Sequence, residues 1–135
     1  MKMFLLLDPP TATAQERQVT VVKNRPIFYQ PEKLKEAKNM LHHHLRPFKP
    51  KEPLDGALEL HVSWLFPKGR HKHKEWRTTK PDTDNLQKML KDVMTDLGFW
   101  KDDAQVVKEV VEKLWCDEPT GIDIEIIELP KIKED

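Results

Sequence analysis

The sequence lacks the features that would direct it to a secreted, membrane or repeat-protein class. Its single cysteine, Cys116, has no partner for an intrachain disulfide, which fits a reducing compartment. No apolar run is long enough to span a membrane, and the apolar run near the start is too short for a signal-peptide core. Internal repeats and low-complexity tracts are also absent. We therefore expect a cytoplasmic globular protein, in which residues 1–135 form one domain.

Net charge is absent as well, because Lys and Arg equal Asp and Glu in number, at 23 each. The sum conceals a division: residues 1–80 carry sixteen basic and eight acidic side chains, whereas residues 81–135 carry seven and fifteen. An evenly basic chain would suggest simple coating of nucleic acid. A basic segment followed by an acidic one suggests a polyanion brought to a metal ion. An ordinary solvated surface explains the composition equally well.

Apolar residues that alternate with polar ones predict strands in several parts of the chain. The expected strands cover residues 3–7, 57–66 and 122–129, with two shorter extended pieces at 19–22 and 27–29. Residues 106–115 are ambiguous, because their apolar pairs recur every four positions as on a helix, while their four valines favour a strand. The pattern by itself leaves this segment open.

Two segments have the periodicity of amphipathic helices. The first begins at Pro31 and ends before Pro47. Its apolar stripe consists of Leu34, Ala37, Leu41 and Leu45. A proline-rich connector, 46–56, follows it. The second helix runs from about Asp84 to Leu97 and is expected to stop at Gly98.

Two acidic side chains lie at the start of the second helix. Asp82 and Asp84 follow Pro81, where an extended backbone would direct both carboxylates to the same side. Like charges held this close must share a proton, separate or bind a cation, and such oxygen ligands suit Mg²⁺, with Mn²⁺ as a substitute. Either aspartate can instead cap the helix, and Asp84 with Gln87 matches a capping box. One cap is enough for one helix, so both acids together favour a metal site.

Two further groups can complete such a site. Asp102 and Asp103 follow the second helix, and a β-α-β unit would bring the start of the next strand beside the start of the helix. The alternative is a pair of solvated turn residues. Lys88 lies one turn after Asp84, where its ammonium can stabilise charge on a phosphate or form a surface ion pair worth about 0.3–0.5 kcal/mol. Both interpretations stay open from the residues alone.

A basic segment, residues 68–80, leads into the carboxylates. It carries six Lys and Arg and two His against one Glu, with Trp76 as its aromatic residue. Its position predicts contacts with phosphates on either side of the one that is cut. The predicted DNA-binding residues are Lys68, Arg70, Lys72, Lys74, Arg77 and Lys80. The three consecutive histidines at 42–44 cannot all face one ion on a helix, so we expect a partly exposed helix end there.

The segment from Pro81 to Val107 resembles a known family. It contains D-x-D-N-L-x-K, a helix ending in G-F-W, and D-D-A-Q-V, in the order typical of the RusA family of Holliday-junction resolvases. The layout from 57 to 129 is similar to the family, whereas residues 1–56 match only loosely. The resemblance implies an α+β homodimer with a small mixed β-sheet and two main helices packed on it. It also implies that residues 106–115 form a strand.

The resemblance further implies an enzyme that cuts four-way DNA junctions with Mg²⁺, through paired nicks in opposed strands, in DNA recombination and repair. By motif position, the catalytic residues are Asp82, Asp84, Asp103 and Lys88, and the three aspartates are the metal ligands. Asp102 would be a neighbour that tunes the site. One departure is that residues 78–81 hold Thr-Thr-Lys-Pro immediately before the first aspartate, where the family has several arginines, and the basic cluster lies further upstream. The residues that bind DNA and any preferred cleavage sequence therefore stay open.

The expected partners are four-way junction DNA and a second copy of the chain, with no membrane and no organic cofactor. Three alternatives stay open beside a junction resolvase. The first is a nuclease for other branched DNA, which the same carboxylates would serve. The second is a protein that binds junction or branched DNA without cleaving it. The third, a structural protein with no nucleic-acid partner, is disfavoured by the basic segment.

Overall fold

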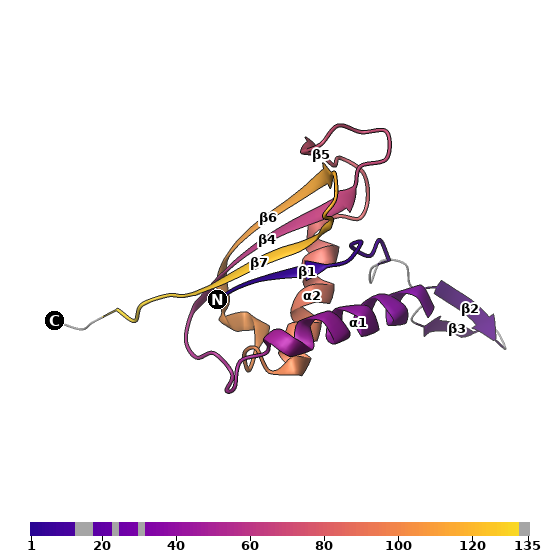
Figure 1. The fold of residues 1–135 in the computed structure, drawn as a ribbon. Coiled ribbons are helices and arrows are strands. Elements are labelled where there is room, and N and C mark those ends of the chain that lie inside the picture. Colours follow the sequence, from indigo (N-terminus) through magenta and orange to yellow (C-terminus); the bar gives the residue numbers. More distant parts are fainter. Residues whose placement is uncertain (13–17, 23–24, 30–31, 133–135) are drawn as a thin grey trace.

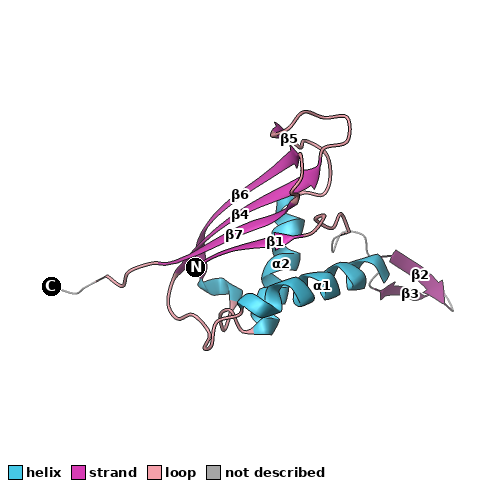
Figure 2. Cartoon of the chain, viewed as in Figure 1, coloured by secondary structure: helices cyan, strands magenta, loops and turns pink. Residues whose placement is uncertain are grey.

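The computed structural model describes residues 1–12, 18–22, 25–29 and 32–132. Within these residues the chain forms a five-stranded mixed sheet, a separate two-stranded hairpin and two α-helices (Figures 1 and 2). The predicted α+β class, with a small mixed sheet and two main helices, is confirmed. None of the described helices combines the length and apolar character that crossing a membrane requires.

The main sheet has the strand order β1-β7-β4-β6-β5. Its strands are β1 (Lys2–Leu6), β4 (Leu58–Pro67), β5 (Glu75–Trp76), β6 (Val106–Cys116) and β7 (Gly121–Glu128). Strands β4 and β6 are parallel neighbours, and the other pairs in the sheet are antiparallel. The connection between β4 and β6 contains α2 (Thr83–Leu97), so β4, α2 and β6 form a β-α-β unit.

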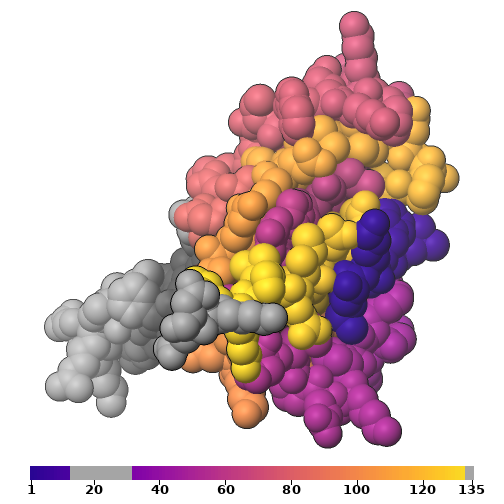
Figure 3. Space-filling view, turned by 90° about the vertical axis from the view of Figure 1, so that its left-hand side faces the viewer, coloured from indigo at the N-terminus to yellow at the C-terminus, as the bar shows by residue number. Residues whose placement is uncertain are grey.

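Helices α1 (Glu32–Leu45) and α2 pack on one face of this sheet (Figure 1). Strand β4 alternates strictly between buried and partly exposed residues, and its buried side chains face the helices. The stripe predicted for α1 is fully buried in the same core: Leu34, Ala37, Leu41 and Leu45. Figure 3 shows strands β1, β7, β4 and β6 side by side in their pairing order. The fold thus has two layers, with α2 and β6 next to each other in the crossover unit.

The predicted boundaries are largely confirmed. Helix α2 begins one residue before the expected Asp84 and ends at Gly98, whose φ of 86° is in the left-handed region that favours glycine. The family resemblance was right that residues 106–115 belong to a strand, β6. Apolar residues on both faces of β6 produced the misleading period. The two-residue strand β5 pairs only with Leu114 and Trp115, and Val107 and Val110 are exposed.

Near the N-terminus, β2 (Gln18–Val22) and β3 (Arg25–Tyr29) pair in antiparallel fashion, which confirms the two extended pieces predicted there. The turn between them and the predicted helix start at Pro31 lie outside the described residues. The connector after α1 starts with a short 3₁₀ turn, η2 (Arg46–Phe48). It then docks on the end of α2 through a 2.8 Å hydrogen bond from the Leu54 amide to the carbonyl of Phe99.

Candidate active site

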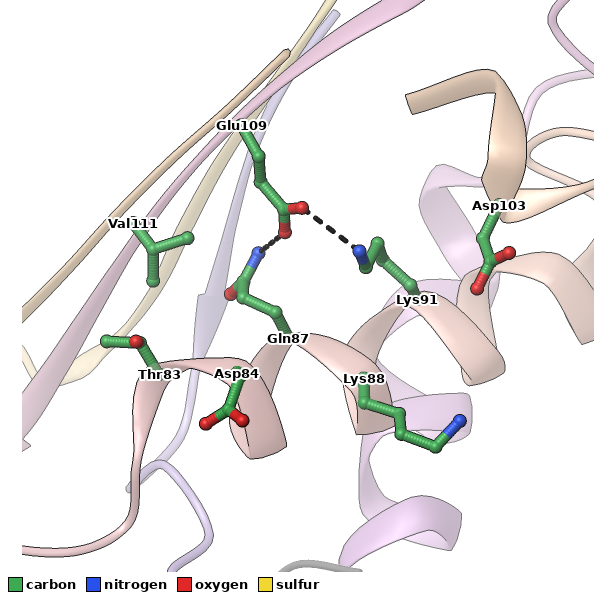
Figure 4. Close-up of a pocket in the computed structure, with 8 residues that line it drawn as sticks. All are labelled: Thr83, Asp84, Gln87, Lys88, Lys91, Asp103, Glu109 and Val111. Carbon is green, nitrogen blue, oxygen red and sulfur yellow. Dashed lines mark hydrogen bonds and ion pairs between the residues drawn. The ribbon is translucent and has the colours of Figure 1, made fainter. Parts of the chain in front are cut away.

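One pocket lies between α2 and β6, with a volume of about 470 Å³. Figure 4 shows its lining: Thr83, Asp84, Gln87, Lys88, Lys91, Asp103, Glu109 and Val111. Asp103 belongs to a 3₁₀ turn, η3 (Asp103–Gln105), and the last two residues come from β6. Three of the four predicted catalytic residues, Asp84, Lys88 and Asp103, are therefore brought to one pocket. The fourth, Asp82, precedes Thr83 and is not part of the lining.

Helix α2 presents the pocket residues because of its spacing. Asp84 and Lys88 are four residues apart and form one row, while Thr83, Gln87 and Lys91 form the adjacent row. The third side of the helix carries the core residues Leu86, Met89, Leu90, Val93 and Met94, all buried. Burial of this apolar side fixes the rotation of the helix, so the two polar rows must face β6 and the solvent beside it.

Asp82 occupies the N-cap position of α2 without capping it through its side chain. Its backbone is extended, at φ −72° and ψ 149°, and its carbonyl accepts the amide of Leu86 at 3.1 Å. The alternative capping box of Asp84 with Gln87 is not formed either, because Asp84 lies inside the helix and Gln87 bonds elsewhere. Neither aspartate is thus explained by capping.

The adjacent acids Asp102 and Asp103 have different surroundings. Asp102 caps η3: its carboxylate accepts a hydrogen bond from the amide of Ala104 at 2.9 Å, and the amide of Asp102 donates to Oε1 of Gln105 at 3.1 Å. Asp103 carries no such bond and lines the pocket. In the part of the chain that the structure describes, the side chains of Asp82, Asp84 and Asp103 form no hydrogen bond or ion pair. All three predicted ligands keep their carboxylate oxygens available.

The three carboxylates do not converge on a single point. Figure 4 shows Asp84 at one end of the pocket and Asp103 at the other, beside Lys91. The prediction that the crossover would bring the start of the next strand beside the start of α2 is wrong. Strand β6 starts near the C-terminal end of α2, because β4 and β6 are parallel, so η3 lies beside the last turns of the helix and does not reach its first turn. Over residues 1–12 and 32–132, no three His, Cys, Asp or Glu side chains gather closely enough to hold a metal ion. The metal-ligand assignment stays a prediction.

Lys88 is not paired with Asp84. Its ammonium lies 4.0 Å from a carboxylate oxygen of Asp92, one turn further along, and the side chain is 62% exposed. Figure 4 shows the side chain directed away from Asp84, toward the Asp103 end of the pocket. The ion pair considered from sequence is absent between these two described residues, so the ammonium is accessible from solvent.

Sequence reasoning missed the residues that line the wall of the pocket. Glu109 accepts hydrogen bonds from Nε2 of Gln87 at 2.6 Å and from the ammonium of Lys91 at 3.0 Å. Gln87 also accepts the indole N–H of Trp64 at 2.7 Å. The four-residue spacing of Gln87 and Lys91 beside Asp84 and Lys88 was a usable signal. Glu109 offered none, because the register of β6 is needed to place it over α2.

The basic segment 68–80 follows β4 and contains β5, whose Glu75 and Trp76 pair with β6. None of its residues lines the pocket. Arg70, Lys72, Lys74 and Lys80 are exposed, and Lys68 is partly exposed beside Asp117. Arg77 differs from these five predicted DNA-binding residues. Its guanidinium lies over the rings of Phe66 and Trp115, 4.2 and 4.4 Å from their centroids, and burial lowers its pKa.

The chain is similar to proteins of one known family. The model of the family described as "Endodeoxyribonuclease RusA" matches residues 8–127. The chain is 34% identical over 126 residues to "Crossover junction endodeoxyribonuclease rusA" of Lactococcus phage r1t, covering 91% of this chain and 94% of the phage protein. It is 50% identical over 42 residues to "Uncharacterized protein YqaN" of Bacillus subtilis (strain 168), covering 31% and 29% of the two chains. The chain belongs to the RusA family of endodeoxyribonucleases.

Proposed function

We propose that this endodeoxyribonuclease resolves four-way (Holliday) DNA junctions with Mg²⁺, by paired nicks in opposed strands, during DNA recombination and repair. The observation that carries the proposal is the pocket between α2 and β6, which Asp84, Lys88 and Asp103 line from two separate segments. The phage r1t relative supports the substrate, since it is named as a crossover junction endodeoxyribonuclease and is similar over 91% of this chain.

The chemistry of the donor set suits a hard divalent cation, although the three carboxylates do not converge in this structure. Asp82, Asp84 and Asp103 offer carboxylate oxygens that no described cation or N–H group engages, and Mg²⁺ and Mn²⁺ prefer such ligands. These three residues would hold the ion, with Mn²⁺ as a substitute for Mg²⁺. When bound, the ion supplies Lewis-acid chemistry and lowers the pKa of a coordinated water.

The two lysines of the pocket have different roles. Lys91 is neutralised by Glu109, at 3.0 Å, and fixes the wall of the pocket. Lys88 is held only by a 4.0 Å approach to Asp92, so its ammonium is free to stabilise the negative charge that develops on the phosphate. The exposed lysines and Arg70 of segment 68–80 bind phosphates that flank the cleaved one.

Two symmetric cuts require two active sites. The chain offers one pocket with this set of residues in the part that the structure describes. A homodimer with twofold symmetry would present two such pockets to the two opposed strands of a junction. Dimerisation is therefore part of the proposal.

The decisive experiment offers the purified protein a synthetic four-way junction, a flap substrate and a matched linear duplex, each with Mg²⁺ or with EDTA. We expect paired, Mg²⁺-dependent nicks in the junction alone. Asp84→Asn should abolish the nicks and retain junction binding, because it removes a ligand without disturbing the fold. Asp96→Asn is the matched control, since Asp96 lies on the same helix, outside the pocket, and is 69% exposed.

The other outcomes contradict specific parts of the proposal. Equal cleavage of the flap would indicate a nuclease for branched DNA in general. Tight junction binding without cleavage by the unmodified protein would indicate a binding protein. Mixing unmodified and Asp84→Asn subunits tests the dimer. Mixed dimers should nick one strand without resolving the junction. Paired cleavage that only falls in proportion to the fraction of unmodified protein, without singly nicked junctions, would argue against a dimer.

A further inference from the structure

Two cationic side chains hold the backbone that leads into α2. The ammonium of Lys113 donates to the carbonyl of Thr79 at 2.8 Å and to that of Pro81 at 2.7 Å. The carbonyl between them, that of Lys80, accepts a 2.5 Å hydrogen bond from Nη2 of Arg77. Three consecutive carbonyls are thus bound by two cations. We name this arrangement, Arg77 and Lys113 with the carbonyls of residues 79–81, the carbonyl clamp.

The donors of the carbonyl clamp are themselves fixed by the sheet. The amide of Arg77 donates to the carbonyl of Lys113 at 3.0 Å, which joins the segment to β6. Stacking on Phe66 and Trp115 holds the guanidinium in place. Lys113 lies opposite Trp64 in the register of β4 and β6, on the sheet face that the helices cover. Rigid elements therefore support both cations.

Charge and burial distinguish these two cations from the exposed ones of segment 68–80. Burial lowers the pKa of Lys113, the nearby guanidinium of Arg77 lowers it further, and the carboxylate of Asp82 acts in the opposite direction. A partly buried ammonium is costly unless it is hydrogen-bonded, and the carbonyls of Thr79 and Pro81 provide those bonds. Both side chains are thus hydrogen-bonded to the backbone and remain partly exposed.

The carbonyl clamp ends at the residue directly before Asp82. Because Asp82 makes no side-chain bond to the helix start, its position depends on the backbone that precedes it. The first turn of α2 continues from the same backbone and carries Asp84. Anything that fixes residues 79–81 therefore also fixes where the two carboxylates emerge from the chain.

We propose that Lys113 and Arg77 are positioning residues, which hold the backbone of residues 79–81 so that the Asp82 and Asp84 carboxylates stay in place for a divalent cation. This role rests on the metal-dependent cleavage proposed above. It also gives Arg77 a different task from the other basic residues of segment 68–80, which contact DNA phosphates.

The test replaces Lys113 by Met, which has a similar length and no donors. We expect the affinity for Mn²⁺, measured by titration of the protein without DNA, to fall by about 10-fold or more. The rate of junction cleavage at low Mg²⁺ should fall similarly and recover at high Mg²⁺, while junction affinity in EDTA stays unchanged. Lys113→Arg, which retains donors, should restore most of the Mn²⁺ affinity. Lys108→Met is the control, because Lys108 lies on the same strand with a 64% exposed side chain.

Combination with Asp82→Asn shows whether Lys113 acts through that carboxylate. If it does, adding Lys113→Met to Asp82→Asn should produce a much smaller loss of Mn²⁺ affinity than Lys113→Met alone produces. Full additivity would overturn the proposal. So would a loss of junction affinity in EDTA with unchanged Mn²⁺ affinity, since that result identifies a DNA contact.

Further measurements distinguish a folding defect, or a failure of the proposed function, from a failure of the positioning role. Circular dichroism and thermal unfolding report whether Lys113→Met is folded, and an activity loss that only follows the folded fraction would overturn a positioning role. Should that variant not fold, Arg77→Lys, which keeps the charge and loses the planar fork, should lower Mn²⁺ affinity in the same direction. If the unmodified protein binds Mn²⁺ without cutting junctions, the proposed function fails, yet a drop in Mn²⁺ affinity still supports the carbonyl clamp.

Discussion

The indole nitrogen of Trp64 donates a 2.7 Å hydrogen bond to Oε1 of Gln87, and both side chains are buried. The amide nitrogen of the same glutamine donates to Glu109 at 2.6 Å. The acceptor side of the amide is set by the indole, which can only donate, so the donor side must face the pocket. One side chain thereby connects the core of the sheet to the wall of the pocket.

Replacing Gln87 by Leu should lower the free energy of unfolding by about 1–3 kcal/mol, because the buried indole N–H of Trp64 loses its acceptor. Urea denaturation followed by fluorescence measures the change. The double variant Trp64→Phe with Gln87→Leu should lose less than the sum of the two single changes, since it leaves no buried donor unsatisfied. Additive losses would show that the bond contributes little.

The adjacent acids Asp102 and Asp103 should separate stability from catalysis. Asp102→Ala removes the side-chain cap of η3 and should cost about 1 kcal/mol of unfolding free energy, with cleavage per folded molecule largely retained. Asp103→Asn should leave stability within about 0.5 kcal/mol and abolish Mg²⁺-dependent cleavage. Thermal unfolding and junction cleavage, measured on both variants, decide the assignment. The reverse pattern would move the predicted ligand to Asp102.

Lys88→Ala should reduce the cleavage rate by about 100-fold at saturating junction, because it removes the ammonium that we propose stabilises the phosphate. Its effect on unfolding free energy should be below about 0.5 kcal/mol, since the side chain is 62% exposed and 4.0 Å from Asp92. Lys101→Ala, on an exposed lysine after α2, serves as the control. A shared loss of activity in both variants would indicate a general effect of charge.

Cys116 should react slowly with alkylating reagents in the folded protein. Burial raises the pKa of its thiol, so at pH 8 a smaller fraction is present as the reactive thiolate than in an ordinary cysteine. The native protein should be modified by iodoacetamide at least about tenfold more slowly than the denatured chain, and the rate should keep rising above pH 9. Mass spectrometry follows the reaction. Equal rates for both forms would contradict this environment.

Much of the fold could be predicted from sequence because its signals are local. The stripe from Leu34 to Leu45 needs only helical spacing, and Gly98 marks a helix end through its own backbone preference. Strand β6 could not be decided from its pattern, because apolar residues on both of its faces mimic a helical period. The family resemblance resolved that segment where periodicity did not.

The same distinction between local spacing and strand pairing decides which residues of the site could be predicted. Asp84 and Lys88 follow from spacing on one helix, and the motif adds Asp103 from the next loop. The arrangement of Glu109 opposite α2 requires the pairing of β6 with β4, which no local pattern contains. Arg77 shows the same limit: its charge is visible in the sequence, but the rings of Phe66 and Trp115 beneath it are not.

The pairing of β1 with β7 has a consequence for synthesis of the protein on the ribosome. The Met1 ammonium donates to the carbonyl of Ile126, across 125 positions, and the whole of β1 is paired with β7. Strand β1 is synthesised before β7 and must therefore wait, with its apolar side uncovered, until β7 has been translated. Stalled or truncated nascent chains would expose Met3 and Leu5 of β1, both buried in the complete fold, and should be preferred substrates for chaperones.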